Sequence, residues 1–440
     1  MEQVSRRRFL KATVAGALAA GSGVVSGCSG PVVSAFNTGA KPTLEFWAFT
    51  NTRTAWQEKA WKLYQQQQKP DFDLHFLILP YSQMHDKIMI TSQAGSGGPD
   101  IADIEISQFS RYIKGDVIFL DMTPKLQQRG VLDKLYRPSA TDPWSWNGKV
   151  YGLGNELNTC LLSYRWDIWD KAKVKTPIAT WEEFAEQAQK FHQDTGNYLL
   201  DVPYTDWGTW WMLTLQQNGG FFGPDGKPTL NAPPSIKTLA FQKTAIKDGW
   251  TILRPTGQAY NAALSSGTVA SLLGPSWQFS GFVQQNLKET AGKWHLQAFP
   301  RWTAGGSRTA TWGGTGVTVL KTSPLAEEAV DFVVWEHTTP EAVLFDFEER
   351  QVWPTFKPAF QDPRLTQPIP FFDNQPVGKL IEEVSPEINK WYNSPFWPET
   401  TDACVRVGIT PAMQDPARSA AAALNAAQQE ALSIIQFETA

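Results

Sequence analysis

The tryptophans carry the plainest chemistry in this chain. An indole offers a flat, polarisable surface to the C–H face of a sugar ring, and its single N–H can donate to a hydroxyl. Carboxylates, amides and arginines can then hold the hydroxyls by paired hydrogen bonds. Because 20 tryptophans among 440 residues are more than packing alone usually recruits, we expect some to bind a saccharide, although most should be core. They gather in three places: Trp144 with Trp146, Trp207 with Trp210 and Trp211, and Trp391 with Trp397.

Side chains arranged for catalysis or for a metal are scarce. The five histidines form no His-Glu-x-x-His motif and no close pair, so a zinc site has little support. The chain has no Gly-x-Ser-x-Gly turn. Gly226-Lys227 imitates a phosphate-binding loop, but Phe221 and Pro228 occupy positions that need Gly and Ser or Thr, so it indicates a hairpin turn. We expect no catalytic residue, no metal and no cofactor.

The N-terminal 28 residues predict export. Ser5–Lys11 contains paired arginines before Phe-Leu-Lys and resembles a twin-arginine signal. The uncharged run that follows is too short and too rich in Gly and Ala to span a bilayer. Val25-Ser26-Gly27-Cys28 resembles a bacterial lipobox. We therefore expect a signal peptide over 1–27, lipid on Cys28, a flexible lipidated tether over 28–41, and an extracytoplasmic protein anchored to the membrane.

The composition of the remaining chain suits an exported globular protein. Residues 1–27 carry four basic and one acidic side chain, so their removal changes the formal net charge from −4 to −7. There is no basic stripe of the kind that nucleic acid requires, and no second apolar run of about 20 residues. At roughly 100–200 residues per domain, two or three domains are expected. Cys160 and Cys404 could form a disulfide, but the apolar surroundings of Cys160 favour packing as a small hydrophobe.

Predicted strands and helices alternate along the chain. The strands are expected at Leu44–Phe49, Phe72–Leu79 and Pro99–Ile106. Capping boxes predict helices that begin near Thr54 and Thr180. Pro at the first helical position predicts three more helices, at Pro324, Pro340 and Pro416. The alternation indicates an α/β fold with a parallel sheet covered on both faces.

Four segments, taken in order, resemble the extracellular solute-binding proteins of ABC importers, in the group that includes the maltose-binding protein. Each motif is weak alone, but together they cover nearly all of residues 42–435 in the family's order. The segments are Gly148–Phe184, Asn218–Asn231, Ser266–Trp277 and Gly313–Val319.

The resemblance implies a two-lobed periplasmic-binding-protein-like fold with a ligand cleft between the lobes. It places three hinge crossings near Asn155–Asn158, Thr311–Gly316 and Gln351–Pro354. Lobe 1 is expected over 42–155 plus 316–350, and lobe 2 over 156–312 plus 354–440. The implied function is a monomeric receptor that captures a carbohydrate, closes around it and delivers it to the permease subunits of an ABC importer.

The ligand-binding candidates combine residue chemistry with this resemblance. Trp277 follows Gly-Pro-Ser, and Trp210 and Trp211 precede Asn-Gly-Gly, where relatives present cleft aromatics. Trp47 lies at the carboxyl end of a strand, and Glu105 is an acid in an apolar strand beside the deeper Asp103. Asn51 and Arg53 are expected in the loop after the first strand, and Gly313 and Gly314 let the backbone approach a ligand. Gln108 stands where relatives often have an aromatic, which weakens the transfer there.

Alternatives remain open at this point. An exported glycosidase with two carboxylates is compatible with the many acidic residues, because sequence spacing alone does not exclude it. A surface adhesion protein is disfavoured by the lobe pattern. Among binders, mono-, di- and longer saccharides all fit, as does another polar solute such as a glycerol phosphodiester.

Overall fold

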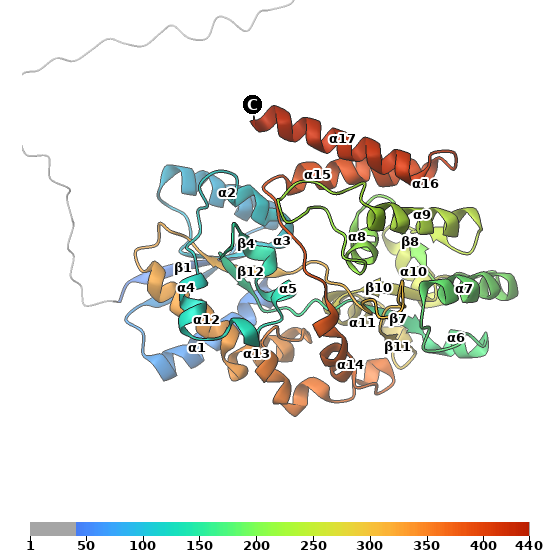
Figure 1. Cartoon of the computed structure of the whole chain (residues 1–440). Coiled ribbons are helices and arrows are strands. Elements are labelled where there is room, and N and C mark those ends of the chain that lie inside the picture. Colours follow the sequence, from blue (N-terminus) through green and yellow to red (C-terminus); the bar gives the residue numbers. More distant parts are fainter. Residues whose placement is uncertain (1–40, 440) are drawn as a thin grey trace, which may run out of the picture. The chain divides into compact units, whose positions relative to one another are not determined.

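A computed structural model describes residues 41–439 (Figure 1). The predicted signal peptide, the lipidated Cys28 and all of the tether except residue 41 lie outside the described residues, so those predictions stay predictions.

Lobe 1 is the part of the chain built on a five-stranded sheet with the order β2-β1-β3-β12-β6. The first three strands lie within a residue or two of their predicted bounds and run parallel, as predicted. β12 is antiparallel to both β3 and β6, so the sheet is mixed and the parallel prediction holds only for β1–β3. The strands are β1 (Thr43–Ala48), β2 (Asp73–Ile78), β3 (Ile101–Glu105), β6 (Gly152–Gly154) and β12 (Thr315–Val319).

Helices cover this sheet on both faces, as predicted (Figure 1). The first helix begins at Asn51, with Thr50 as its N-cap residue. This start is three residues before the predicted capping box at Thr54. Asn51 and Arg53 therefore lie in a helical turn and not in a loop. The long helices of lobe 1 are α1 (Asn51–Gln68), α2 (Tyr81–Ala94), α12 (Ala326–Thr338) and α13 (Pro340–Arg350). The short elements are α3 (Ile106–Phe109), η1 (Ser110–Tyr112), α4 (Thr123–Gln128), α5 (Arg137–Ala140), η3 (Asp142–Trp144), β4 (Ser145–Trp146) and β5 (Lys149–Val150).

Lobe 2 is the part built on the three-stranded antiparallel sheet β10-β7-β11. The capping box at Thr180 is confirmed, since the Thr180 hydroxyl accepts from the Glu183 N–H and Phe184, Ala188 and Phe191 are buried on one face. The strands are β7 (Leu161–Arg165), β10 (Ser271–Gly274), β11 (Trp294–Gln297) and the small pair β8 (Asp201–Val202) and β9 (Ile252–Leu253). The helices are α6 (Trp166–Lys171), α7 (Trp181–Thr195), α8 (Gly208–Leu215), α9 (Pro233–Lys247), α10 (Gln258–Ser266), the π-helix η4 (Trp277–Val283) and α11 (Gln284–Asn286).

The chain after α13 contributes to both lobes. Short turns between 357 and 372 and helix α14 (Val377–Val384) lie below the sheets, and α15 (Trp397–Ala403), the π-helix η10 (Cys404–Ile409), α16 (Thr410–Gln414) and α17 (Ala420–Thr439) lie above α8 and α9 (Figure 1). The tip of α17 reaches back to lobe 1, where Lys114 pairs with Glu438 and with Glu399 at 3.4 Å. Cys160 and Cys404 are buried free thiols.

The chain passes between the two sheets at three places. The first passage lies between β6 and β7, the second between β11 and β12, and the third follows α13. The passages run side by side, because Glu156 pairs with Pro354 and Thr159 pairs with Thr311 in isolated bridges. Gly316, predicted to lie at a crossing, is within β12 instead. Three adjacent crossings of the chain form a joint of the kind about which two lobes can rotate.

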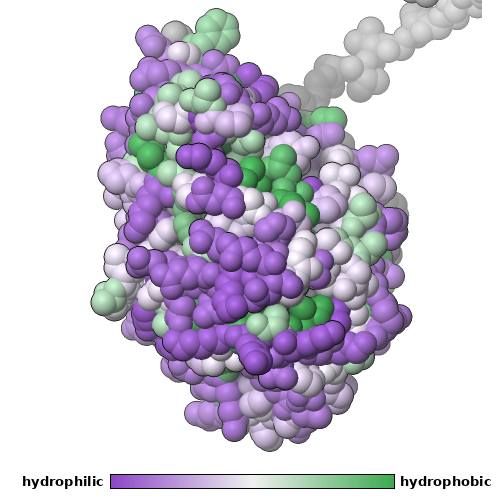
Figure 2. Space-filling model, turned by 90° about the vertical axis from the view of Figure 1, so that its right-hand side faces the viewer, coloured by the Kyte–Doolittle hydropathy of each residue, from purple (hydrophilic) through white to green (hydrophobic). Residues whose placement is uncertain are grey.

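The outer surfaces carry few apolar features. The face of lobe 2 turned away from lobe 1 is mainly hydrophilic, with scattered hydrophobic side chains (Figure 2). None of the helices within residues 41–439 is long and apolar enough to cross a bilayer.

Candidate functional site

A cavity of about 640 Å³ lies between the two lobes. Ser107, Gln108 and Arg111 line it from lobe 1, at the carboxyl end of β3. Thr205, Asp206, Trp207 and the first two turns of the α15–η10 segment line it from lobe 2. We call this cavity the interlobe cleft, because closing the lobes would enclose whatever occupies it.

A second cavity of about 370 Å³, the end pocket, continues from the cleft into lobe 2. The two cavities share Thr205 and Asp206. The lining residues of the end pocket all belong to lobe 2 or to the second crossing: Pro203, Tyr204, Thr205, Asp206, Arg254, Pro255, Thr256, Gly257, Tyr260, Trp277, Gln278, Phe282 and Trp312.

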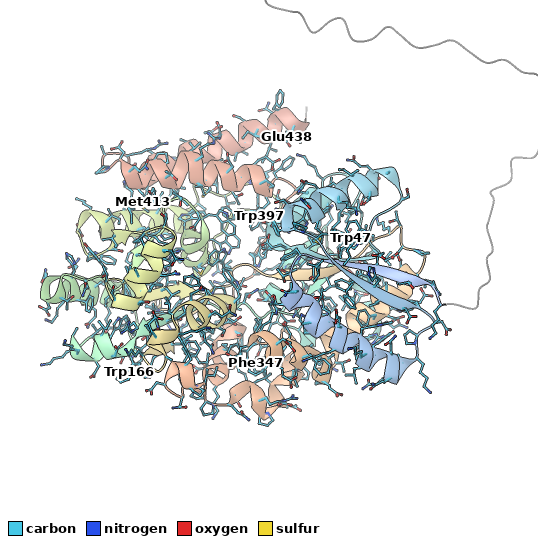
Figure 3. The ribbon with its side chains drawn as sticks, turned by 180° about the vertical axis from the view of Figure 1, so that it is seen from behind. Trp47, Trp166, Phe347, Trp397, Met413 and Glu438 are labelled. Carbon is cyan, nitrogen blue, oxygen red and sulfur yellow. The ribbon has the colours of Figure 1, made fainter. Side chains whose placement is uncertain are left out.

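Four indoles form a continuous aromatic wall along these cavities. The ring centroids of Trp277 and Trp312 are 5.1 Å apart, those of Trp312 and Trp207 are 6.3 Å apart, and those of Trp207 and Trp397 are 5.9 Å apart. Trp277, Trp312 and Trp207 are half-buried, so each keeps an accessible part. Trp397 is nearly fully buried where the lobes meet (Figure 3). Successive rings are tilted by 53°, 78° and 80°, so the wall presents indole faces and edges in turn, and its accessible surface comes from the three half-buried indoles.

Of the predicted stacking residues, Trp277 is on this wall. It opens the π-helix η4, a distortion that is frequent at functional sites. Its indole N–H donates to the backbone carbonyl of Trp312 at 3.2 Å, which fixes the ring while leaving its face available.

Trp210 and Trp211 lie beneath the wall, with 1% and 2% of their surface exposed. Every residue of α8 is buried, so no face of this helix is left for a ligand. Trp211 stacks on Phe221 at 4.8 Å and packs against Trp397 at 5.5 Å. The accessible position belongs to Trp207, just before α8, so Trp210 and Trp211 support the wall from below.

The glycines at the second crossing make room for the protein's own side chains. Gly313 has φ +74°, and a Cβ there would lie 3.0 Å from the Trp277 indole nitrogen. Gly314 has φ +121°, and a Cβ would lie 2.6 Å from the Asn158 amide. The absence of a Cβ at these two positions therefore leaves space for the Trp277 ring and for the Asn158 side chain of the first crossing. Direct contact of this backbone with a ligand stays a prediction.

Glu105 lies at the end of β3, next to the cleft, and is already hydrogen-bonded. Its carboxylate accepts from the Ser107 N–H at 2.9 Å, from the Ser107 hydroxyl and from the Tyr81 hydroxyl at 3.1 Å. Burial raises the pKa of Glu105, and the hydrogen bonds from Ser107 and Tyr81 oppose that rise. Nearby, Arg111 donates to Gln108 at 3.1 Å and to Asp86 at 2.8 Å.

Arg53 is 2% exposed and sits in a charge network instead of the cleft. It donates to both oxygens of Asp103, at 2.7 and 3.1 Å, and to Glu156 at 2.8 Å. Arg350 donates to the same Glu156 oxygen at 2.8 Å. Burial lowers the pKa of Arg53, but Asp103 and Glu156 outweigh it and hold that pKa above its ordinary value. The network ties α1 and β3 to the first crossing and to α13.

The other two lobe 1 candidates, Asn51 and Trp47, do not line the interlobe cleft. Asn51 is exposed at the start of α1. The Trp47 ring is 3% exposed and is covered by the ammonium group of Lys87, 4.5 Å from its centroid. Figure 3 shows Trp47 within lobe 1, away from Trp397.

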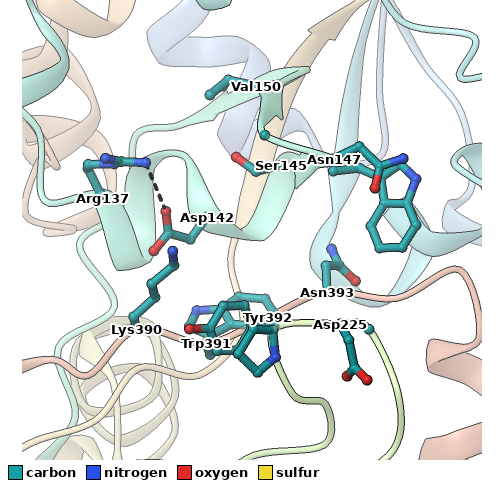
Figure 4. Close-up of a pocket in the computed structure, with 14 residues that line it drawn as sticks. Arg137, Asp142, Ser145, Asn147, Val150, Asp225, Lys390, Trp391, Tyr392 and Asn393 are labelled. Atoms are coloured by element: carbon teal, nitrogen blue, oxygen red, sulfur yellow. Dashed lines mark ion pairs between the residues drawn. The ribbon is translucent and has the colours of Figure 1, made fainter.

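A third cavity of about 360 Å³ also lies between the lobes (Figure 4). Arg137 and Asp142 face it from lobe 1, 3.8 Å apart, and burial raises the pKa of Asp142. From lobe 2 it is lined by Asp225 and by 390–393. The chain from 391 to 397 separates this cavity from the interlobe cleft, since Trp391 lines one and Trp397 lines the other. The Trp391 indole N–H donates to the Pro138 carbonyl at 3.0 Å and so fastens the segment to lobe 1.

Comparison with known proteins decides the family. Residues 48–335 match the family model for the bacterial extracellular solute-binding protein. The chain belongs to this family. An arabinooligosaccharide-binding protein of Bacillus subtilis is 30% identical over 423 residues, which cover 92% of this chain and 95% of the relative. A protein of the same description from Halalkalibacterium halodurans is 29% identical over 336 residues, 73% of this chain and 74% of the relative.

Solved structures confirm the two-lobed fold of this solute-binding protein. The sugar-binding protein MalE of Xanthomonas citri superposes with a TM-score of 0.75 at 18% identity, covering 90% of this chain and 99% of that chain. A crystal structure of an extracellular solute-binding protein of family 1 gives a TM-score of 0.72 at 20% identity, covering 89% and 100%. Within residues 41–439 no three His, Cys, Asp or Glu side chains are grouped to hold a metal.

Sequence reasoning missed Trp207 and Trp312 as wall residues, and Arg254 and Gln278 as pocket residues. Trp207 belongs to the same tryptophan cluster as Trp210, and Trp312 directly precedes the Gly313-Gly314 pair that was singled out. Such neighbours are the available signal for the two indoles and for Gln278, which directly follows Trp277, whereas nothing local marks Arg254.

Proposed function

We propose that this solute-binding protein captures a neutral oligosaccharide in the interlobe cleft and delivers it, unchanged, to an ABC importer. The observation that carries the proposal is the aromatic wall, in which the half-buried indoles of Trp277, Trp312 and Trp207 follow one another over more than the width of a single sugar ring. Polar groups of lobe 1 at the opposite side suit the hydroxyl rim of the same ligand.

The two relatives described as arabinooligosaccharide-binding proteins support this ligand class. Both are matched over about three quarters or more of their length, so the resemblance includes both lobes. We therefore propose arabinooligosaccharides as the first ligands to test.

Charge at the site disfavours an anionic ligand such as a glycerol phosphodiester. Arg254 is paired with the fully buried Asp201, and Asp206 adds a further negative charge where the two cavities meet. Arg111 is paired with Asp86. Without an uncompensated cation, a phosphate would lose its hydration with no matching charge, whereas a neutral sugar avoids that cost.

The binding experiment is a thermal-shift screen followed by calorimetry. Arabinose and arabinooligosaccharides of two to five units are added to the protein from residue 41 onward, with maltooligosaccharides and glycerol phosphodiesters in parallel. A ligand that binds only the folded state raises the melting temperature. We expect the oligosaccharides of arabinose to give the largest shift, and no shift with any saccharide would contradict the proposal.

A binder and a glycosidase are separated by recovering the ligand. After overnight incubation with stoichiometric protein, chromatography should return the oligosaccharide at its original length. Shorter products would instead support the enzyme alternative.

We further propose that lipid on Cys28 holds the receptor at the outer face of the membrane, as a monomer. Support comes from the sequence motifs alone. Cys28→Ala should move the protein from the membrane to the soluble fraction, and a membrane-bound variant together with an unacylated wild type would contradict the anchor.

A further inference from the structure

The end pocket contains polar groups that the protein itself leaves unpaired. The Gln278 side chain makes no hydrogen bond to residues 41–439: its Oε1 is buried against Gly274 without a partner, and its Nε2 is the end that is not fully buried, although the residue is only 7% exposed. A buried amide in this state is costly unless something else supplies the partner. Because Gln278 lines the cavity, its Nε2 group can donate to a bound ligand.

Arg254 gives a second such group. Its Nε donates to Asp201, whereas its two Nη groups make no hydrogen bond to residues 41–439. The guanidinium is held in position by this ion pair and by the Tyr260 ring, whose centroid lies 4.8 Å below it. A fixed guanidinium with free N–H groups at a cavity wall is preorganised to donate to a pair of neighbouring hydroxyls.

Charge specifies the chemistry of the ligand group. Arg254 is balanced by Asp201, which is 0% exposed, so the pair contributes no net charge to the pocket. Asp206, at the entrance, accepts from the Gly208 N–H through one oxygen at 2.8 Å and keeps the other available. The pocket as a whole is thus mildly negative, and it repels a carboxylate or a phosphate while accepting hydroxyls.

The position of the pocket specifies which part of the ligand enters. Its walls come from lobe 2 and the second crossing, with none from the body of lobe 1, and it joins the interlobe cleft at Thr205 and Asp206. Trp277 and Trp312 flank it with their rings. A saccharide that lies along the aromatic wall therefore has one end in this pocket and its next ring in the cleft.

We propose that the end pocket is the specificity site of this receptor: it binds the terminal ring of a neutral oligosaccharide, with Gln278 and Arg254 hydrogen-bonded to that ring's hydroxyls. This inference rests on the proposed function and deepens it, because it identifies the part of the binding site that selects the ligand. Lobe 2 then holds the ligand before closure, and lobe 1 closes over the rings that remain in the cleft.

The test is calorimetric titration of Gln278→Leu, Arg254→Lys and Thr256→Trp with arabinotriose. Leu is similar in size to Gln278 and removes both polar atoms of the amide. Lys keeps the positive charge opposite Asp201 but removes the two Nη groups of the guanidinium. Trp at the exposed Thr256 fills the pocket. Gln284→Leu is the matched control, since it makes the same chemical change just beyond η4 and outside the pocket. Ligand-free melting temperatures accompany every titration.

We expect each of the three variants to bind at least tenfold more weakly than wild type, and Gln284→Leu to bind as wild type does. Wild-type binding of an arabinotriose oxidised to a terminal carboxylate should also be weaker than that of the neutral sugar if the oxidised end enters the pocket. If all folded variants bind like wild type, the end pocket is not the specificity site while the proposed function stands. If wild type binds no saccharide, the proposed function itself fails. Since Thr256 is exposed, its variant tests the pocket even if a substitution at Gln278 prevents folding.

Discussion

The two walls of the cleft differ in how their polar groups are used. On lobe 1, the Oε2 atom of Glu105, the Oε1 atom of Gln108 and the Arg111 guanidinium are engaged by neighbouring side chains or backbone. On lobe 2, Gln278 and the Nη groups of Arg254 have no partner among residues 41–439, and the indoles beside them are half-buried. The lobe 1 wall is therefore more fully hydrogen-bonded without a ligand than the lobe 2 wall.

This difference suggests a division of labour. An incomplete wall gains most from a ligand, because its buried polar groups acquire partners and its aromatic faces lose water. A complete wall must exchange hydrogen bonds that it already has, so it adds less affinity and contributes mainly shape and enclosure. Substitutions on lobe 1 should therefore act first on folding, and those on lobe 2 first on affinity.

The largest expected effect is on the stability of lobe 1. Arg53→Ala leaves Asp103 and Glu156 as buried carboxylates without this partner, and breaking a buried ion pair in this way costs about 3–5 kcal/mol. Denaturant titration measures it. Arg364→Ala, which removes an exposed ion pair with Asp362, should change stability by about 1 kcal/mol or less. Equal effects of the two would refute the buried charge network as a source of stability.

The next effect is on affinity at lobe 2. Trp277→Ala removes an aromatic anchor and should weaken oligosaccharide binding by at least about 2 kcal/mol, or roughly thirtyfold, with little change in melting temperature. Trp211→Ala is the contrast, because a buried Trp costs about 3–5 kcal/mol of folding stability. If Trp277→Ala melts far below wild type yet binds normally once folded, Trp277 is core and the wall is misplaced.

Glu105→Gln is expected to have a smaller effect on binding. The amide keeps the shape of the carboxylate but removes its charge. It therefore weakens the hydrogen bonds that Glu105 accepts, including any from a sugar hydroxyl, and a hydrogen bond to a charged group is worth about 1.5–3 kcal/mol. Calorimetry at pH 7 should show an affinity loss below that of Trp277→Ala. A greater loss would mean that lobe 1, and not lobe 2, dominates recognition.

The effect that is smallest near neutral pH is a pH dependence of the stability of lobe 1. Burial lowers the pKa of His85 to about 4, whereas an unfolded histidine titrates near about 6.5. The folded state therefore binds fewer protons, and stability from His85 is full above pH 6.5 and falls as the pH drops toward 4, by at most about 1.4 kcal/mol per pH unit. Denaturant titrations between pH 4 and 7 should show a flatter slope for His85→Gln than for wild type.

Local sequence patterns predicted the strands and helices of the molecule better than the residues of its binding site. β1–β3 and the helix capped by Thr180 follow from short apolar runs and from a capping box that acts within four residues. α8 has apolar side chains around its whole circumference, so its sequence could not show that Trp210 and Trp211 face inward while Trp207 remains accessible. Arg53 was misplaced for another reason: its partners Asp103 and Glu156 lie 50 and 103 residues away, and only the fold brings them together.

The central claim is that one ligand binds between the hydrogen-bonded groups of lobe 1 and the unpaired polar groups and indoles of lobe 2, and brings the two lobes together. Small-angle X-ray scattering tests it most directly, on the protein from residue 41 onward, with and without arabinotriose at a concentration that calorimetry shows to be saturating. The account predicts a smaller radius of gyration with the sugar bound. An unchanged radius at demonstrated saturation would contradict it.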